Sequence, residues 1–90
     1  DFNFTSDKPP YKVMTEYFAD AKKDSSMRPY GPDGTFNGFR FDQPVTRRID
    51  YIFLYGTWEI MNYATISDSR DMRYPSDHFP VLAEINPIYE

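Results

Sequence analysis

The sequence predicts a small α/β domain that has mostly antiparallel strands and one short helix. From Tyr11 to about Lys22 the apolar residues recur every three or four positions, as they do on one side of a helix. Two other segments, 48–55 and 81–85, are apolar runs of the length of strands. With 40% apolar and 19% aromatic residues among 90, the chain is too hydrophobic to be disordered. Its length limits it to a single small domain.

The helix is expected to begin after the polar segment 6–10, which ends in two prolines. Its apolar side chains form one stripe that we expect to be buried: Val13, Met14, Tyr17, Phe18 and Ala21. The next segment, 24–34, has Ser, Pro and Gly without periodicity, which indicates a loop.

The strongest strand signal is the segment 48–55, which Gly56 ends. Residues at odd and even positions are apolar from Tyr51 onward, so both faces of this strand should be covered. We expect a tight turn at Gly56 and Thr57, and antiparallel pairing of 48–55 with the extended segment 58–66. A short strand is expected at 34–39, a surface loop at 67–73 and a buried strand at 81–85.

The run from Tyr74 to Pro80 is a candidate site because it contains His78, the single histidine of the chain. Prolines stand on both sides of the Ser-Asp-His triplet and restrict the backbone there, so the triplet is presented on a stiff loop. An acid and an imidazole on the rim of a sheet are suited to metal-assisted hydrolysis, which needs an oxygen ligand and a group that titrates near neutrality.

Asp50 is unusual because it lies in a strand made otherwise of Ile, Tyr, Phe and Leu. A buried carboxylate has to be paired or hydrogen-bonded, or it takes up a proton. One interpretation is an ion pair with Arg47 or Arg48. The other is that Asp50 accepts a hydrogen bond from His78 and fixes the tautomer of its ring, as the acid does in a Ser-His-Asp triad. The sequence leaves both open.

Asp1 and Asn3 are two positions apart on a segment that we expect to be extended, which puts their side chains on one face. A carboxylate beside a carboxamide can orient a water molecule and donate to a phosphoryl oxygen. As an isolated pattern, Asp-x-Asn is more often the polar end of a strand.

Four motifs carry a resemblance to a known family, and they occur in the order Asp1-Phe2-Asn3, Gly34-Thr35-Phe36-Asn37, Arg48-Ile49-Asp50-Tyr51-Ile52 and Ser76-Asp77-His78-Phe79-Pro80. Together they resemble the closing motifs of the endonuclease/exonuclease/phosphatase superfamily, which has the deoxyribonuclease I-like fold. The resemblance implies that residues 1–90 are a single partial domain, the C-terminal half of a four-layer α/β/β/α sandwich. It also implies that a preceding half of the same domain supplies an Asn and a Glu for a metal.

The resemblance further implies a role for each matching residue in a metal-dependent phosphoesterase. Asp1 would activate the attacking water, Asn3 would steady the phosphate in the transition state, and Asp50 would orient His78. His78 would contact the scissile phosphate, Asp77 would bind the metal, and Thr35 and Asn37 would lie near the substrate. The implied cofactor is Mg²⁺, with Mn²⁺ as an alternative.

The composition also bears on which substrates and partners the chain could have. The net charge of -4 argues against a broad basic face, so a phospholipid, a sugar phosphate or another small phosphoester is at least as good a candidate as nucleic acid. The alternative to an enzyme is a non-catalytic fragment or interaction module that self-associates through an uncovered sheet face. We expect no membrane span. The absence of cysteine indicates no particular compartment.

Overall fold

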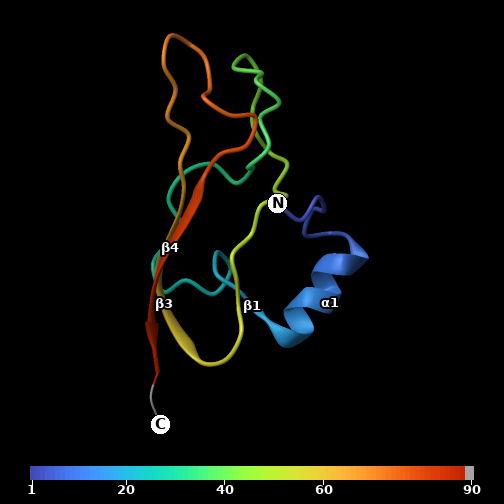
Figure 1. Cartoon of the computed structure of the whole chain (residues 1–90), viewed down its shortest axis with the longest axis vertical. Helices are drawn as coiled ribbons and strands as arrows, with labels where there is room; N and C mark the ends of the chain where they lie inside the picture. The colour runs from blue at the N-terminus through green and yellow to red at the C-terminus, as the bar shows by residue number, and fades with distance from the viewer. Residues whose placement is uncertain (89–90) are drawn as a thin grey trace.

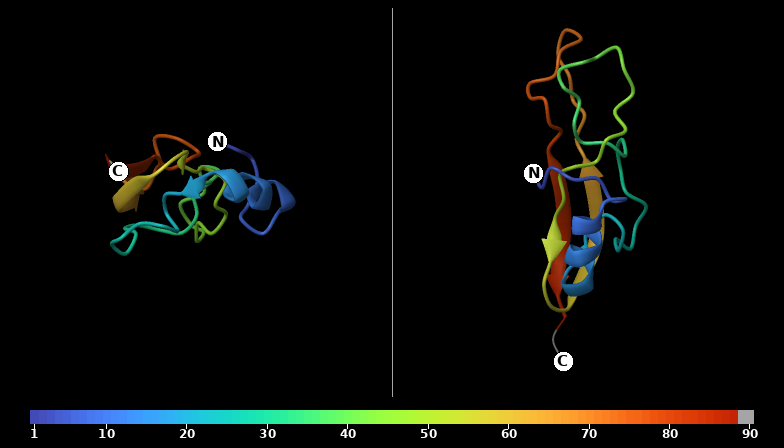
Figure 2. Two further views of the ribbon diagram at one scale, coloured as in Figure 1. Left: turned by 90° about the horizontal axis from the view of Figure 1, so that it is seen from below. Right: turned by 90° about the vertical axis from the view of Figure 1, so that its right-hand side faces the viewer.

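The computed structural model describes residues 1–88 and gives the chain an elongated, layered shape (Figure 1). The elements in chain order are α1 (Pro9–Tyr17), β1 (Ala19–Asp20), β2 (Phe53–Leu54), β3 (Trp58–Thr65) and β4 (Val81–Pro87). The strands form two antiparallel two-stranded sheets, β1–β2 and β3–β4. Figure 2 shows α1 on the outer side of β1–β2 and the β3–β4 sheet on the other side. Within the described residues, the prediction of one short helix with antiparallel strands is confirmed.

Helix α1 is shorter and less buried than predicted. It starts with proline in its first turn, as expected, but ends at Tyr17 instead of near Lys22. The chain turns extended at Phe18 because Ala19 and Asp20 pair with β2. No helix residue is buried, so the prediction of a buried stripe on the helix was wrong. Of the expected stripe, Val13 and Tyr17 are exposed, Met14 and Phe18 are half-buried, and Ala21, which lies beyond the helix, is buried. No helix among the described residues has the length and apolar character needed to cross a membrane.

The strand pairing also differs from the prediction. The segment 58–66 does form a strand, β3, but its partner is β4, with Tyr63 opposite Ala83, and not the segment 48–55. Regular strand structure in 48–55 is confined to β2, which pairs with β1 instead. Gly56 does make the expected bend, with a φ of 91°, and it turns the chain from one sheet into the other.

Two further strand predictions were wrong in detail. The segment 34–39 forms no strand and is reduced to a single bridge between Phe36 and His78. Strand β4 is half-buried rather than buried, since inward Val81, Ala83 and Ile85 alternate with exposed residues. That alternation is typical of an antiparallel strand with one face on the core. The polar segment 67–73 is an exposed loop, as predicted.

The core lies between the two sheets. Its centre is formed by Ala21, Ile60 and Tyr63, which are buried, and side chains of β1, β2 and β4 pack against them. A second cluster, of aromatic rings, fills the space between β2 and the N-terminal segment: Phe2, Phe4, Tyr11, Tyr51 and Phe53. The aromatic residues of this part therefore serve packing, as their position in the sequence predicts.

The backbone of Gly31 lies so close to the backbone of Thr65 that it leaves no room for a side chain. Gly31 has a φ of 91°, and a Cβ added there would lie 2.0 Å from the carbonyl oxygen of Thr65. We expect Gly31→Ala to lower the free energy of unfolding by about 2–4 kcal/mol, because it combines a left-handed backbone with a backbone clash. Urea unfolding followed by circular dichroism measures the loss.

Gly56→Ala is the matched control, because Gly56 has the same φ of 91° but its added Cβ would meet only Trp58 Nε1, at 3.9 Å. We expect it to cost only the conformational part, about 1–2 kcal/mol. Equal losses in the two variants would contradict the argument from the contact with Thr65.

Candidate active site

Three titratable side chains from distant parts of the sequence meet at one point. His78 Nδ1 lies 2.8 Å from Asp50 Oδ2, which is a hydrogen bond. On the other side of the ring, His78 Nε2 lies 3.8 Å from Asp1 Oδ2. One ligand atom from each of these three residues falls within 4.8 Å of the others. The predicted contact between His78 and Asp50 is therefore confirmed, and Asp1 lies beside it.

Asp50 is positioned by Thr35. The hydroxyl oxygen of Thr35 accepts hydrogen bonds from the backbone N–H groups of Ile49, at 3.0 Å, and Asp50, at 3.1 Å. Thr35 is fully buried, so water does not compete for these hydrogen bonds. The segment 49–51 lacks a regular strand partner, and these bonds hold the backbone of Asp50 in its place.

His78 is positioned by the segment 35–37, which runs along the histidine loop. The N–H of Phe79 donates to the carbonyl of Thr35, at 2.7 Å, and the N–H of Asn37 donates to the carbonyl of Asp77, at 2.8 Å. The side-chain amide of Asn37 also donates to the carbonyl of Ser76, at 3.0 Å. The loop that presents the imidazole is thus fixed by main-chain and amide contacts, in agreement with the stiff loop that the prolines predict.

Burial and hydrogen bonding change the pKa of Asp50 in opposite directions. Burial alone would raise the pKa of its carboxyl, but hydrogen bonds from His78 and Thr35 bring that pKa below the ordinary value of 3.8. Asp50 is therefore ionised throughout the neutral range. An ionised acceptor at Nδ1 keeps the proton on that nitrogen, and Nε2 then faces Asp1 with a lone pair or, when the ring is charged, a second proton.

The other interpretation of Asp50, an ion pair with Arg47 or Arg48, was wrong, because among the described residues neither arginine lies within ion-pair distance of its carboxylate, which pairs with His78. The guanidinium of Arg48 binds Asp20 through two hydrogen bonds, and the one from Nη1 measures 2.9 Å. Asp20 is 1% exposed and also accepts a hydrogen bond from the hydroxyl of Tyr11, at 2.7 Å. Arg48 lies flat over the ring of Tyr51, 4.5 Å from its centre. This network ties α1, β1 and the segment 48–51 together and leaves Asp50 free for the histidine.

The remaining predicted residues lie around the cluster in different ways. Asn3 has a φ of 61°, so the segment is not extended there and the argument that it shares a face with Asp1 was wrong. Among the described residues, Asp77 is outside the three-residue cluster, although it precedes His78. Thr35 and Asn37 are buried, and the contacts above engage their side chains within the protein. Their predicted roles toward substrate, and that of Asp77 toward a metal, stay predictions.

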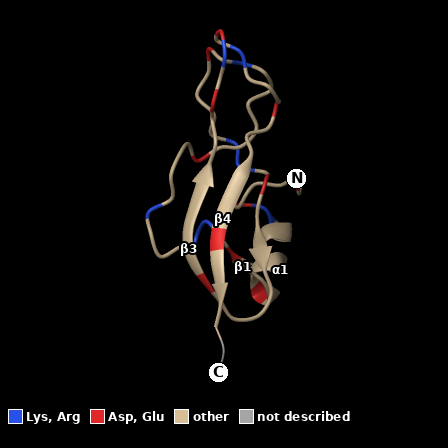
Figure 3. Ribbon diagram, turned by 60° about the vertical axis from the view of Figure 1, so that its left-hand side comes forward, with Lys and Arg blue, Asp and Glu red and all other residues tan. Residues whose placement is uncertain are grey.

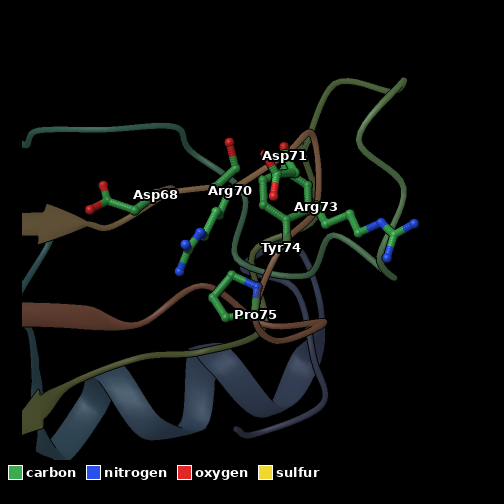
Figure 4. Close-up of a pocket in the computed structure, with 7 residues that line it drawn as sticks. Asp68, Arg70, Asp71, Arg73, Tyr74 and Pro75 are labelled. Carbon is green, nitrogen blue, oxygen red and sulfur yellow. The ribbon is translucent and has the colours of Figure 1, made fainter.

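Sequence reasoning missed two features of this region. Phe36 packs edge-on against the ring of His78, with 5.3 Å between the ring centres. A hollow in the loop before His78 is lined by residues 68–71 and 73–75, which the sequence indicated only as a surface loop (Figure 4). Apart from the neighbouring Arg73 and Tyr74, the sequence gives no signal for this hollow, because the hollow depends on how the loop folds.

The comparisons with known proteins assign the family. A model of the Endonuclease/Exonuclease/phosphatase family matches residues 1–78. The chain belongs to this family. No curated protein matches it.

Solved structures with the same fold support the family assignment. A functionally unknown conserved protein from Enterococcus faecalis V583 is 38% identical, with a TM-score of 0.88, and the match covers 98% of this chain and 34% of that one. A mannosyl-6-phosphatase from Bacteroides thetaiotaomicron VPI-5482 is 30% identical, with a TM-score of 0.81, and the match covers 96% of this chain and 35% of that one. A third, from Bacteroides vulgatus, carries the family name and is 26% identical, with a TM-score of 0.81. The chain spans about a third of the length of the first two structures.

Proposed function

We propose that this chain is the C-terminal catalytic portion of a Mg²⁺-dependent phosphoesterase. The observation that carries the proposal is the contact of His78 Nδ1 with Asp50 Oδ2 at 2.8 Å, with Asp1 on the far side of the ring. The ring is oriented by an ionised acid, and its second nitrogen points to a partly exposed carboxylate. Family membership supplies the reaction class, hydrolysis of a phosphoric ester.

Each residue then has a defined task in the hydrolysis. Asp1 orients a water molecule and accepts one of its protons as the water oxygen bonds to phosphorus. The bond between phosphorus and the ester oxygen breaks, the leaving oxygen takes up a proton from solvent to become an alcohol, and Asp1 returns its proton to solvent. His78 contacts the scissile phosphate through Nε2, and Asp50 holds the ring in place and stabilises its charged form. Asn3 is proposed to donate to a phosphoryl oxygen.

The donor set of the cluster fits a hard cation. Two of its three residues are carboxylates, and Mg²⁺ is commonly held by one or two carboxylates together with water and substrate phosphate oxygens. The imidazole suits such a cation less well and is engaged with Asp50. We therefore propose that Mg²⁺ or Mn²⁺ would be held by Asp1 of the cluster and by Asp77, which lies outside the cluster and is the metal ligand that the family resemblance implies. When bound, the cation would neutralise charge on the phosphoryl oxygens.

A sugar phosphate is the first substrate class that we propose to test. One of the similar structures is named a mannosyl-6-phosphatase, at 30% identity. The net charge of -4 gives no broad basic surface for a nucleic-acid strand.

The test is a phosphate-release assay on the full-length protein with sugar phosphates, phenyl phosphate and nucleic acid. We expect release from a phosphomonoester that stops on chelation and returns with Mg²⁺. Asp77→Asn should raise the Mg²⁺ concentration for half-maximal activity by at least about tenfold, since it removes a charged oxygen ligand. Asp24→Asn, at an exposed position outside the site, is the control. Release that is indifferent to chelator, or absent with every phosphoester, would contradict the proposal.

A further inference from the structure

The hollow before the histidine loop has the size of a small-molecule pocket. Its volume is about 620 Å³, and it lies between the end of β3 and the histidine loop (Figure 4). Its lining is formed by Asp68, Ser69, Arg70, Asp71, Arg73, Tyr74 and Pro75. Pockets of roughly 300–1,000 Å³ accept ligands of metabolite size.

A tight turn without glycine builds the wall of this pocket. Arg70 and Arg73 exchange two backbone hydrogen bonds of 2.9 Å, and between them Asp71 and Met72 have φ values of 52° and 59°. Positive φ at both central residues is the geometry of a type I′ turn, which usually contains glycine. Backbone conformations that a side chain disfavours are concentrated at functional sites. Figure 4 shows Arg70 extending from this turn toward Pro75, whereas Arg73 extends away.

An aromatic ring held in one orientation completes the pocket. Tyr74 packs edge-on against Phe79, with 5.0 Å between ring centres, and against Phe41 at 5.3 Å. Phe79 is buried and follows His78 directly, so the pocket and the histidine share one rigid support. From Pro75 to His78 the chain has three residue steps, which span at most about 11 Å. The pocket lining therefore comes within about 11 Å of His78.

The charges in the pocket select among possible ligands. The lining residues include two arginines and two aspartates, so their formal charges cancel, and Figure 3 shows the same mixture of signs over the loops at this end of the molecule. A neutral lining gives no attraction for a second phosphate or for a nucleic-acid backbone. It does offer charged donors and acceptors for hydroxyl groups, beside an aromatic ring that can pack on an apolar face.

We propose that this pocket binds the alcohol part of the substrate and that this part is a polyol or sugar, with Arg70 and Tyr74 as its specificity-determining residues. The inference rests on the proposed phosphoesterase function, because it places the phosphate at His78. It adds the recognition of the hydroxylated leaving group and the residues that perform it.

Nuclear magnetic resonance titrations of the full-length protein test the pocket separately from the active site. The three probes are mannose 6-phosphate, phenyl phosphate, which lacks hydroxyl groups, and inorganic phosphate. We expect all three to shift the ring signals of His78, and only mannose 6-phosphate to shift the Arg70 Nε–H and Tyr74 ring signals. If the Arg70 and Tyr74 signals stay still with mannose 6-phosphate, the pocket proposal is overturned. If the His78 signals stay still with every probe, the phosphoesterase site is overturned.

Variants of two exposed arginines give the quantitative readout. We expect Arg70→Ala to weaken mannose 6-phosphate binding by about tenfold or more and to leave phenyl phosphate binding unchanged, since it removes a charged hydrogen-bond donor. Arg28→Ala removes an exposed arginine outside the pocket and should change neither. Equal weakening of both ligands by Arg70→Ala would show a general electrostatic effect and would overturn the assignment of specificity to Arg70.

Discussion

Asp50→Asn is expected to lower the turnover number of the full-length enzyme by about four orders of magnitude, the size of effect found when the acid of a Ser-His-Asp triad becomes an amide. The carboxylate accepts the Nδ1 hydrogen of His78 at 2.8 Å and is ionised in the neutral range. An amide can turn its NH₂ group toward Nδ1, which favours the opposite tautomer of the ring and provides no charge to balance an imidazolium. Steady-state kinetics with a phosphomonoester measures the loss.

Two further measurements separate a positioning role from a structural one. The fold should survive in Asp50→Asn, because the backbone N–H of Asp50 still donates to Thr35, so the midpoint of urea unfolding should move little. The nitrogen shifts of the His78 ring should change from one dominant tautomer to a mixture. Turnover within about tenfold of the unmodified enzyme, with an unchanged tautomer, would show that Asp50 serves the fold alone.

Asp20→Ala is expected to lower the free energy of unfolding by about 3–5 kcal/mol, a large share of the roughly 5–15 kcal/mol that stabilises a typical domain. The carboxylate is 1% exposed and accepts hydrogen bonds from Arg48, Tyr11 and the backbone of Lys22. Without it, the Arg48 guanidinium, whose side chain is 14% exposed, keeps its charge and has no acid to balance it. Urea unfolding at neutral pH measures the loss.

The pH dependence of this loss gives an independent check. Burial would raise the pKa of Asp20, but hydrogen bonds from Arg48 and Tyr11 lower it below 3.8. A group with a lowered pKa stabilises the fold above its unfolded value and loses that contribution as the pH falls through its folded value. The difference between the unmodified chain and Asp20→Ala should therefore be complete above about pH 5 and shrink below pH 3.8.

An ion pair whose acid is exposed serves as the control for Asp20. Lys22 Nζ lies 3.1 Å from Asp33, whose side chain is 94% exposed. Asp33→Ala should cost less than about 1 kcal/mol, because water screens such a pair. A loss for Asp20→Ala no larger than this would mean that the buried network contributes little to stability.

Local sequence patterns predicted those features of the fold that depend on neighbouring residues. Proline marked the start of α1, Gly56 marked the bend, and the segment 58–66 was extended as its composition indicated. Pairing was missed because a hairpin between 48–55 and 58–66 is the nearest option along the chain, whereas β3 pairs with β4 from the far side of the loop 67–80. The helix was predicted, but its end at Tyr17 was missed, because Ala19 and Asp20 pair with β2 and Asp20 binds Arg48, 28 residues away, and no periodicity encodes such contacts.

The candidate site was more accessible to sequence reasoning. Asp50 stood out as an acid in an apolar run, and His78 as a histidine between prolines, so the pair could be predicted and is present. Asn3 was misplaced because its left-handed backbone breaks the two-residue alternation on which its position was inferred. The pocket at 68–75 was not predicted, because it depends on a glycine-free turn whose central residues, Asp71 and Met72, both have positive φ.

One buried residue, Thr35, connects the segments that carry Asp50 and His78. Its hydroxyl oxygen holds the segment of the acid, and its carbonyl oxygen holds the segment of the base. The separation of the two reacting groups is thus set by one neutral spacer that gains or loses no proton across the physiological range. A change at this one residue would therefore disturb the acid and the base together.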